Sequence, residues 1–211
     1  MEFGKNILLV DDHLVVRKGV EMILKSNIQN ATIYGAENYD DAKEILKTVK
    51  IDLILLDINI NGVENIKIMK EIKEIQSQLK ILIFSSHEEN QYGLRYIQNG
   101  ADGYLNKFCS EDVILNAVNE ILLKGSFYSK DIQEKLIEKA KKRNPKSSIE
   151  SLSNREFEIA QLLINGYGNL EISNKLDIQM STVSTYKNRL FEKLGVKNIV
   201  ALSELFKTDN Q

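Results

Sequence analysis

Apolar residues in the first half of the chain follow two alternating spacings. Short, continuous apolar runs are typical of strands buried on both faces. Five such runs occupy residues 6–10, 32–35, 53–56, 81–84 and 103–105. After each run, apolar residues recur every three or four positions, as at Val16 and Val20, which predicts amphipathic helices; the last of these covers residues 111–123. Five successive strand and helix pairs predict an α/β fold with a doubly wound, five-stranded parallel sheet.

The pattern changes after Gly125. A polar helix is expected over residues 129–143, and residues 144–148 contain the only proline of the chain, which is typical of a linker. All later apolar residues follow helical spacing, which predicts helices over 154–164, 169–176, 181–194 and 198–206. We therefore predict three parts: an α/β domain of flavodoxin-like strand order over 1–124, a helical linker over 125–149 and an all-α helical domain over 150–211.

Composition narrows the class of protein. With 43% hydrophobic and 27% charged residues, the chain resembles ordinary globular proteins rather than disordered ones. A single cysteine, Cys109, excludes an intrachain disulfide. No apolar run approaches the roughly 20 residues that span a bilayer, and the N-terminus has no cleavage-site pattern. We expect a cytoplasmic protein with no membrane association.

The net charge of −2 hides an uneven distribution along the chain. Residues 1–123 hold 13 basic and 19 acidic residues, residues 124–148 hold 8 and 3, and residues 149–211 hold 7 and 8. Charge runs are often only solvated surfaces, so this asymmetry is weak support for different partners of the two halves.

Acidic residues follow two of the predicted strands. Asp11 and Asp12 come after the first strand and Asp57 after the third, and Lys107 follows the fifth. Since the carboxyl ends of parallel strands meet at one edge, these side chains should converge. Three carboxylates repel one another, and a hard cation such as Mg²⁺ relieves that repulsion. The cluster predicts a Mg²⁺ site in which Asp57 attacks a phosphoryl donor and Lys107 balances the added charge.

Two hydroxyl groups complete this predicted site. Ser85 ends the fourth strand, where it can donate to a phosphoryl oxygen, and Tyr104 lies on the fifth strand beside it. Each residue alone is better explained by an ordinary role, such as a helix cap for an aspartate or an unremarkable lysine, serine or tyrosine. The coincidence of all these residue types at strand ends favours a phosphorylation site with Ser85 and Tyr104 as a switch pair.

Four motifs then resemble one family. They are VDDH at 10–13, LLDI at 55–58, IFSS at 83–86 and GADGYLNK at 100–107. Over residues 5–123 the chain resembles a response-regulator receiver domain. The resemblance implies that Asp57 accepts the phosphoryl group and that Lys107 pairs with it, with Ser85 and Tyr104 as the switch. It also implies Mg²⁺ ligands from Asp11, Asp12, Asp57 and the backbone carbonyl of Asn59.

The helix expected from Ser181 has two different faces. Val183, Leu190 and Leu194 form an apolar face suited to packing, and the opposite face carries small polar side chains. Such side chains beside lysine and arginine suit base edges in a major groove, with phosphate contacts alongside. On pattern alone, an ordinary solvated helix is equally plausible.

Motifs in the last 60 residues favour the DNA-binding interpretation. LSNRE at 152–156, EI at 171–172, STVSTY at 181–186 and KLGV at 193–196 resemble a LuxR-type helix-turn-helix over residues 150–207. A receiver joined to this domain is similar to the NarL/FixJ class. The resemblance implies base contacts from Ser184, Thr185 and Asn188, and phosphate contacts from Thr182, Lys187, Arg189 and Lys193. Leu170 departs from the class, which often has lysine there.

The resemblance implies a bacterial two-component response regulator that controls transcription and is not an enzyme, with autodephosphorylation left open. A sensor histidine kinase is expected to phosphorylate Asp57. Phosphorylation would then favour a homodimer that binds double-stranded DNA. The near-neutral charge of the last domain predicts weak binding by a monomer, because phosphate neutralisation supplies most non-specific affinity. The last helix is expected to supply part of the dimer contact.

Three alternatives remain open at this point. A phosphatase or phosphotransferase of the haloacid dehalogenase type also uses an aspartate and Mg²⁺, but its acidic motif follows the first strand. Flavodoxin-like nucleotide binding conflicts with Asp11 and Asp12, which would repel a phosphate at the first loop. A receiver that works without phosphorylation is disfavoured by the intact acidic set.

Overall fold

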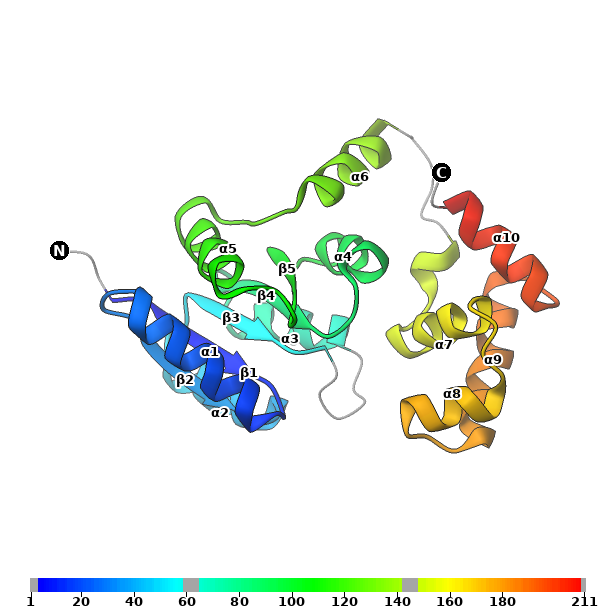
Figure 1. Cartoon of the computed structure of the whole chain (residues 1–211), viewed down its shortest axis with the longest axis horizontal. Coiled ribbons are helices and arrows are strands. Elements are labelled where there is room, and N and C mark those ends of the chain that lie inside the picture. The colour runs from blue at the N-terminus through cyan, green and yellow to red at the C-terminus, as the bar shows by residue number, and fades with distance from the viewer. Residues whose placement is uncertain (1–3, 59–64, 142–147, 210–211) are drawn as a thin grey trace. The chain divides into compact units, whose positions relative to one another are not determined.

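The computed structural model describes residues 4–58, 65–141 and 148–209, and it divides into two units, Met1–Lys142 and Arg143–Gln211 (Figure 1). Each unit is described by itself below. No helix in the described part of the chain is both long and apolar enough to cross a membrane. The finer boundaries at residues 124 and 149 stay a prediction.

The first unit is built on a five-stranded parallel sheet. Its strands pair in the order β2-β1-β3-β4-β5, so the predicted α/β fold and flavodoxin-like order are confirmed. The strands are β1 (Asn6–Val10), β2 (Thr32–Ala36), β3 (Leu53–Leu56), β4 (Lys80–Ser85) and β5 (Gly103–Asn106).

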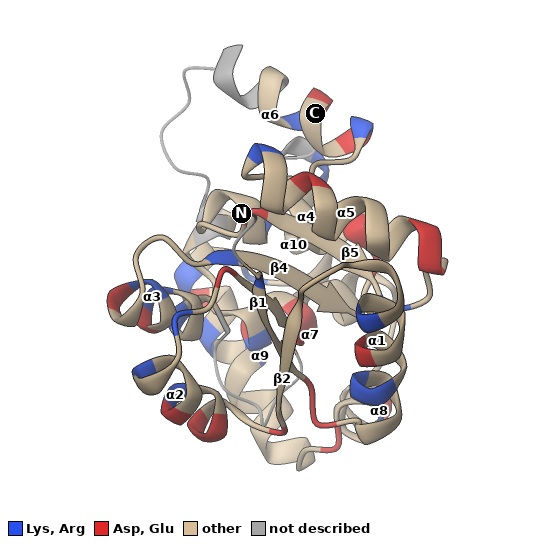
Figure 2. Ribbon diagram, turned by 90° about the vertical axis from the view of Figure 1, so that its left-hand side faces the viewer, with Lys and Arg blue, Asp and Glu red and all other residues tan. Residues whose placement is uncertain are grey.

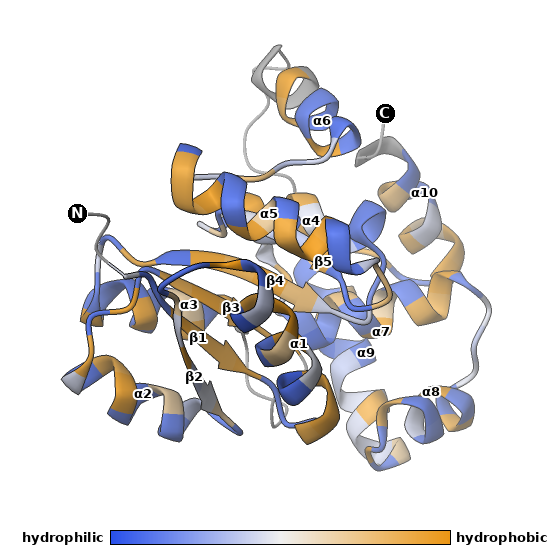
Figure 3. Cartoon of the chain, turned by 60° about the vertical axis from the view of Figure 1, so that its left-hand side comes forward, coloured by the Kyte–Doolittle hydropathy of each residue, from blue (hydrophilic) through white to orange (hydrophobic). Residues whose placement is uncertain are grey.

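Helices cover the sheet and explain why its strands are apolar on both faces. They are α1 (Leu14–Asn27), α2 (Tyr39–Thr48), α3 (Asn65–Ile75), α4 (Glu89–Gln98) and α5 (Glu111–Lys124). Helix α1 contacts α5, and α2 contacts α3. All four residues of β3 are buried, which is why that strand is continuously apolar rather than alternating. Figure 3 shows the central strands as hydrophobic ribbons, and Figure 2 shows the charged residues mainly on helices.

The polar helix α6 (Lys130–Lys141) packs on α4 within the first unit. Its Ile132 is only 1% exposed, and the Lys135 ammonium donates to the Asn90 carbonyl at 3.0 Å. Gly93 on α4 allows this approach, because a Cβ there would lie 3.0 Å from Ile132 Cδ1 and 2.8 Å from Glu89 Cγ. The sequence predicted a polar helix here but gave no sign of its docking site.

The second unit is helical, as predicted. It comprises the 3₁₀ turn η1 (Ser148–Ser151), α7 (Asn154–Ile164), α8 (Asn169–Leu176), α9 (Met180–Leu194) and α10 (Ile199–Asp209). Helix α9 packs on α7 and α8, and α10 packs on α7. Val183, Leu190 and Leu202 are fully buried, and the rings of Phe157 and Phe206 lie 5.7 Å apart.

Candidate functional site

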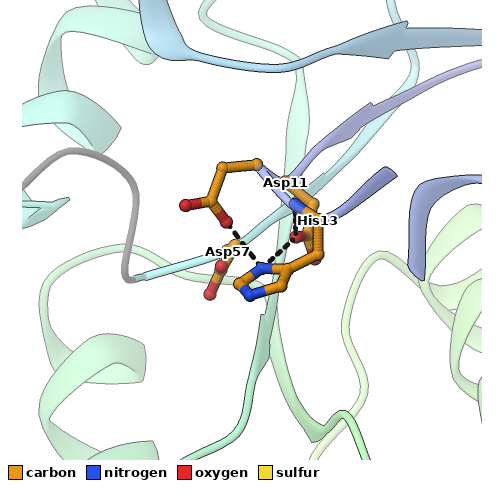
Figure 4. A group of neighbouring side chains, drawn as sticks. Asp11, His13 and Asp57 are labelled. Atoms are coloured by element: carbon orange, nitrogen blue, oxygen red, sulfur yellow. Dashed lines mark hydrogen bonds and ion pairs between the residues drawn. The ribbon is translucent and has the colours of Figure 1, made fainter. Parts of the chain in front are cut away.

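Strand pairing brings the acidic residues of the first unit together. Asp11 and Asp12 directly follow β1, and Asp57 directly follows β3. The neighbouring strands remain in register beyond β3, since the Asp57 amide donates to the Val10 carbonyl at 2.9 Å. Figure 4 shows the side chains of Asp11, His13 and Asp57 turned toward one another at this edge.

Lys107 links the two buried carboxylates of the cluster. Asp57 is 1% exposed and Asp11 is 4% exposed. The Lys107 ammonium lies 2.9 Å from Asp57 Oδ2 and 2.6 Å from Asp11 Oδ2. Burial alone would lower the pKa of Lys107, but the hydrogen bonds to Asp11 and Asp57 outweigh it and raise that pKa. The lysine therefore stays charged and offsets part of the carboxylate repulsion.

The donor set fits a hard divalent cation. Asp11, Asp12, His13 and Asp57 each offer a ligand atom, and these atoms all lie within 4.8 Å of one another. The three carboxylates outnumber the Lys107 charge that bridges two of them, and a cation can offset the repulsion between carboxylates. The Asn59 carbonyl, expected from the family resemblance, lies outside the described residues.

The predicted switch residues meet around the backbone of His87. Ser85 is fully buried, and its Oγ accepts from the His87 amide at 3.0 Å. The Tyr104 hydroxyl donates to the His87 carbonyl at 3.1 Å, and so does the Asn106 side-chain amide. Burial raises the pKa of Tyr104, which keeps its hydroxyl a donor. These three side chains fix the loop between β4 and α4.

Three residues near the site received no role from the sequence. Asn106 shares the His87 carbonyl with Tyr104. The Arg17 guanidinium donates to the Asp11 carbonyl and thereby holds the end of β1. The His13 ring contacts both carboxylates of the acidic pair. His13 was the easiest to find, because it directly follows Asp12, whereas Arg17 and Asn106 show no distinctive pattern.

Helix α9 of the second unit presents the polar face that its sequence predicted. Thr185, Asn188 and Arg189 are exposed, while Ser184 is half-buried. The Ser184 hydroxyl donates to the Met180 carbonyl at 3.1 Å, and the Thr185 hydroxyl donates to the Ser181 carbonyl at 2.9 Å. Asn169 at the start of α8 donates to Ser184 Oγ at 3.2 Å. Both hydroxyl protons are thus used within the helix.

The flanking basic residues differ in their surroundings. Lys187 lies over the Phe191 ring at 5.8 Å from its centroid. Lys193 has a partner that the sequence did not suggest: its ammonium lies 2.6 Å from Glu156 Oε2. Glu156 is 3% exposed and also closes a capping box with Ser153. Burial opposes the charged carboxylate, but the bonds to Lys193 and Ser153 prevail and lower the pKa of Glu156.

Comparison with known families supports the domain types predicted for both units. Residues 7–119 match the response regulator receiver domain, and residues 150–206 match the bacterial regulatory proteins of the luxR family. The chain belongs to the response regulators: it joins a receiver domain to a LuxR-type DNA-binding domain and acts in transcription regulation. Because the chain belongs to this family, the interpretations as a phosphatase or phosphotransferase of the haloacid dehalogenase type and as a flavodoxin-like nucleotide-binding protein are set aside.

Full-length relatives share this organisation. The chain is 33% identical to the Fimbriae Z protein of Escherichia coli K12 over 202 residues, which cover 96% of each protein. It is 30% identical to the response regulator UvrY of the same strain over 202 residues, covering 95% of this chain and 92% of UvrY.

Solved structures support the fold. The RcsB response regulator of Salmonella typhimurium matches with a TM-score of 0.61 and 23% identity, covering 98% of each chain. A second RcsB structure, bound to promoter rprA in the presence of phosphomimetic BeF3-, matches with a TM-score of 0.58 and 24% identity, covering 97% of this chain and 99% of that one.

Proposed function

We propose that a sensor histidine kinase phosphorylates Asp57 and that this phosphorylation controls dimerisation and DNA binding in the cytoplasm. The observation that carries the proposal is the Lys107 ammonium, which bridges the buried carboxylates of Asp57 and Asp11 at 2.9 and 2.6 Å. A buried carboxylate beside a fixed cation is suited to receive a dianionic group.

Asp57 supplies the nucleophile. A carboxylate oxygen of Asp57 attacks the phosphorus of the donor phosphohistidine, the P–N bond breaks, and the imidazole leaves with its electron pair and takes up a proton. The Lys107 ammonium, which pairs with an Asp57 carboxylate oxygen before the reaction, then pairs with a phosphoryl oxygen and stays positively charged. Its short contact with Asp11 keeps the ammonium at the site throughout.

Asp11, Asp12 and Asp57 would hold Mg²⁺ in this site. When bound, the ion polarises the phosphoryl group and offsets its negative charge. Asp11 is fixed for this purpose from two sides, by Arg17 on its carbonyl and by the His13 amide, which donates to its Oδ1 at 2.8 Å. Asp12 is exposed to solvent, whereas Asp11 is buried.

Ser85 and Tyr104 would convert the new charge into a change of shape. The Ser85 hydroxyl can donate to a phosphoryl oxygen at Asp57, and turning toward that oxygen would draw Ser85 Oγ away from the His87 amide, which donates to it at 3.0 Å. Movement of Ser85 would loosen the loop that Tyr104 holds through the His87 carbonyl. The surface around α4 is therefore the expected site of the switch.

Sequence recognition is proposed for the exposed face of α9. Ser184 and Thr185 have donated their hydroxyl protons to the helix, so toward DNA they can act only as acceptors. Acceptors match the amino groups of cytosine and adenine in the major groove. Asn188 can serve as both donor and acceptor, while Thr182, Lys187 and Arg189 are suited to phosphates.

Dimerisation would place two such helices on paired half-sites. On α10, Leu202 and Phe206 are buried within their own unit, but Ile199 is 37% exposed and Val200 is 68% exposed. These two exposed apolar side chains are the part of α10 that remains available for a partner copy.

Incorporation of a phosphoryl group from acetyl phosphate, measured by intact mass, tests the proposal. Wild type should gain one phosphoryl group when Mg²⁺ is present, and the Asp57→Asn variant should gain none. Asp40→Asn is the matched control, because Asp40 is an exposed aspartate on α2 and should not alter the mass gain.

The same samples should be sized by light scattering. A larger mass in solution for phosphorylated wild type, absent in Asp57→Asn, supports control of dimerisation. A wild-type protein that accepts no phosphoryl group would instead indicate a regulator that works without phosphorylation.

A further inference from the structure

We propose that His13 is a nitrogen ligand of the receiver's metal site and biases this site toward first-row transition cations such as Mn²⁺ and Ni²⁺. The inference rests on the proposed metal site and concerns which divalent ions that site accepts. It is carried by the position of the imidazole among the carboxylates (Figure 4).

The two distances from the His13 imidazole to the carboxylates lie on either side of the spacing between neighbouring ligands of one ion. His13 Nδ1 lies 2.6 Å from Asp12 Oδ1 and 3.2 Å from Asp11 Oδ1. Adjacent ligands of an octahedral ion with bonds of about 2.1 Å lie about 3 Å apart. The nitrogen and the two oxygens are therefore spaced so that a single ion can contact all three, with Asp57 within the same 4.8 Å cluster.

The His13 side chain has no role in the helix that it begins. His13 is the N-cap of α1, yet its side chain makes no capping hydrogen bond. Its backbone amide instead donates to Asp11 Oδ1 at 2.8 Å, which holds the residue beside the acidic pair. The side chain is 66% exposed while that of Asp11 is 6% exposed, so the imidazole lies on the solvent side, from which an ion enters.

The chemistry of the nitrogen determines the selectivity. Mg²⁺ prefers oxygen ligands and keeps several waters, so an imidazole adds little to its binding. An imidazole nitrogen adds most to the binding of Ni²⁺ and less to that of Mn²⁺, because the affinities of mixed nitrogen and oxygen sites rise from Mn²⁺ to Ni²⁺. His13 should therefore strengthen the binding of Ni²⁺ and Mn²⁺ and leave that of Mg²⁺ nearly unchanged.

The chain contains only two histidines, which makes the nitrogen assignable in the untagged, full-length protein. Pulsed electron paramagnetic resonance of the Mn²⁺-loaded protein detects ¹⁴N coupling from a bound imidazole. We expect this coupling in wild type and its loss in His13→Ala. His87→Ala is the matched control; the His87 ring stacks on Tyr92 at 4.7 Å, and its removal should leave the coupling in place.

Calorimetric titration with Ni²⁺ and Mg²⁺ gives an independent measurement. His13→Ala should bind Ni²⁺ at least about tenfold more weakly than wild type, since even loss of an outer-shell partner costs about 10- to 100-fold. Mg²⁺ affinity should change by less than about twofold, because oxygen ligands dominate its binding. Circular dichroism checks that the overall helix content is retained, as expected because the His13 side chain makes no capping bond to α1.

The outcomes separate this inference from the proposed function. Equal Ni²⁺ affinity in wild type and His13→Ala, without ¹⁴N coupling, overturns the inference and leaves His13 as a hydrogen-bond partner of the two carboxylates. If Mg²⁺ still binds in that case, the proposed metal site stands. If wild type binds neither ion, the proposed metal site and the inference fail together.

Discussion

Removing the Lys193 ammonium should destabilise the DNA-binding unit rather than only weaken its contact with DNA. Lys193→Met leaves the carboxylate of the buried Glu156 without its 2.6 Å partner. A hydrogen bond to a charged group contributes about 1.5–3 kcal/mol. Glu156 retains its bond from the Ser153 amide, and the Lys193 side chain is 44% exposed, so solvent reduces the expected loss to about 1–2 kcal/mol.

A urea titration in which unfolding is monitored by hydrogen–deuterium exchange measures this loss of stability in the intact chain. Peptides from α7 and α9 report the second unit separately from the receiver. Binding to a generic DNA duplex, measured over a range of salt concentrations, supplies the second readout. Loss of one phosphate contact would lower the slope of log affinity against log salt by about 0.9.

Lys197→Met is the matched control, because it removes an exposed lysine from the same unit. For Lys193→Met, we expect a lower urea midpoint and an unchanged salt slope. An unchanged midpoint with a lower slope would refute the structural role argued here. Lys193 would then be the phosphate contact implied by the family resemblance.

Three further predictions concern packing and pH. Gly93→Ala should destabilise the receiver by about 1–3 kcal/mol through overpacking, measured by thermal unfolding, because the new Cβ would lie 3.0 Å from Ile132 Cδ1. Gly19→Ala in α1 should stabilise the receiver by about 0.5–1 kcal/mol, since nothing lies within 4 Å of the added Cβ. A lower stability of this variant would show that the added methyl group is not accommodated. Because the pKa of Glu156 is lowered in the folded state, its contribution is present near neutral pH and is lost as pH falls below about 4. Glu156→Gln should remove this acid-dependent drop in the urea midpoint, and an unaltered drop would exclude Glu156 as its source.

Much of the receiver was predictable because its signals are local. Continuous apolar runs identified strands that are buried on both faces, and β3 is the clearest example. Parallel pairing then requires residues after β1 and β3 to share an edge, so Asp11 and Asp57 could be placed together without coordinates. The polar face of α9 followed from helical periodicity in the same way.

Contacts between residues distant in sequence required the tertiary structure. Ile132 reaches Gly93 across 39 positions of the chain, and a polar helix carries no signal of the neighbour that its buried Ile132 side chain contacts. Lys193 illustrates the same limit, because its distance from Glu156 depends on how α9 packs on α7. The side-chain orientation of His13 was also unpredictable, since an N-cap residue can turn toward its helix or away from it.

The sequence by itself therefore determined the element order, the sheet and the chemical types gathered at its edge, because periodicity and strand polarity act over a few residues. Only the tertiary structure decided which lysine pairs with the buried Glu156 carboxylate, where α6 docks and which way the His13 imidazole faces. Those choices depend on distances between elements, and such distances are set by packing.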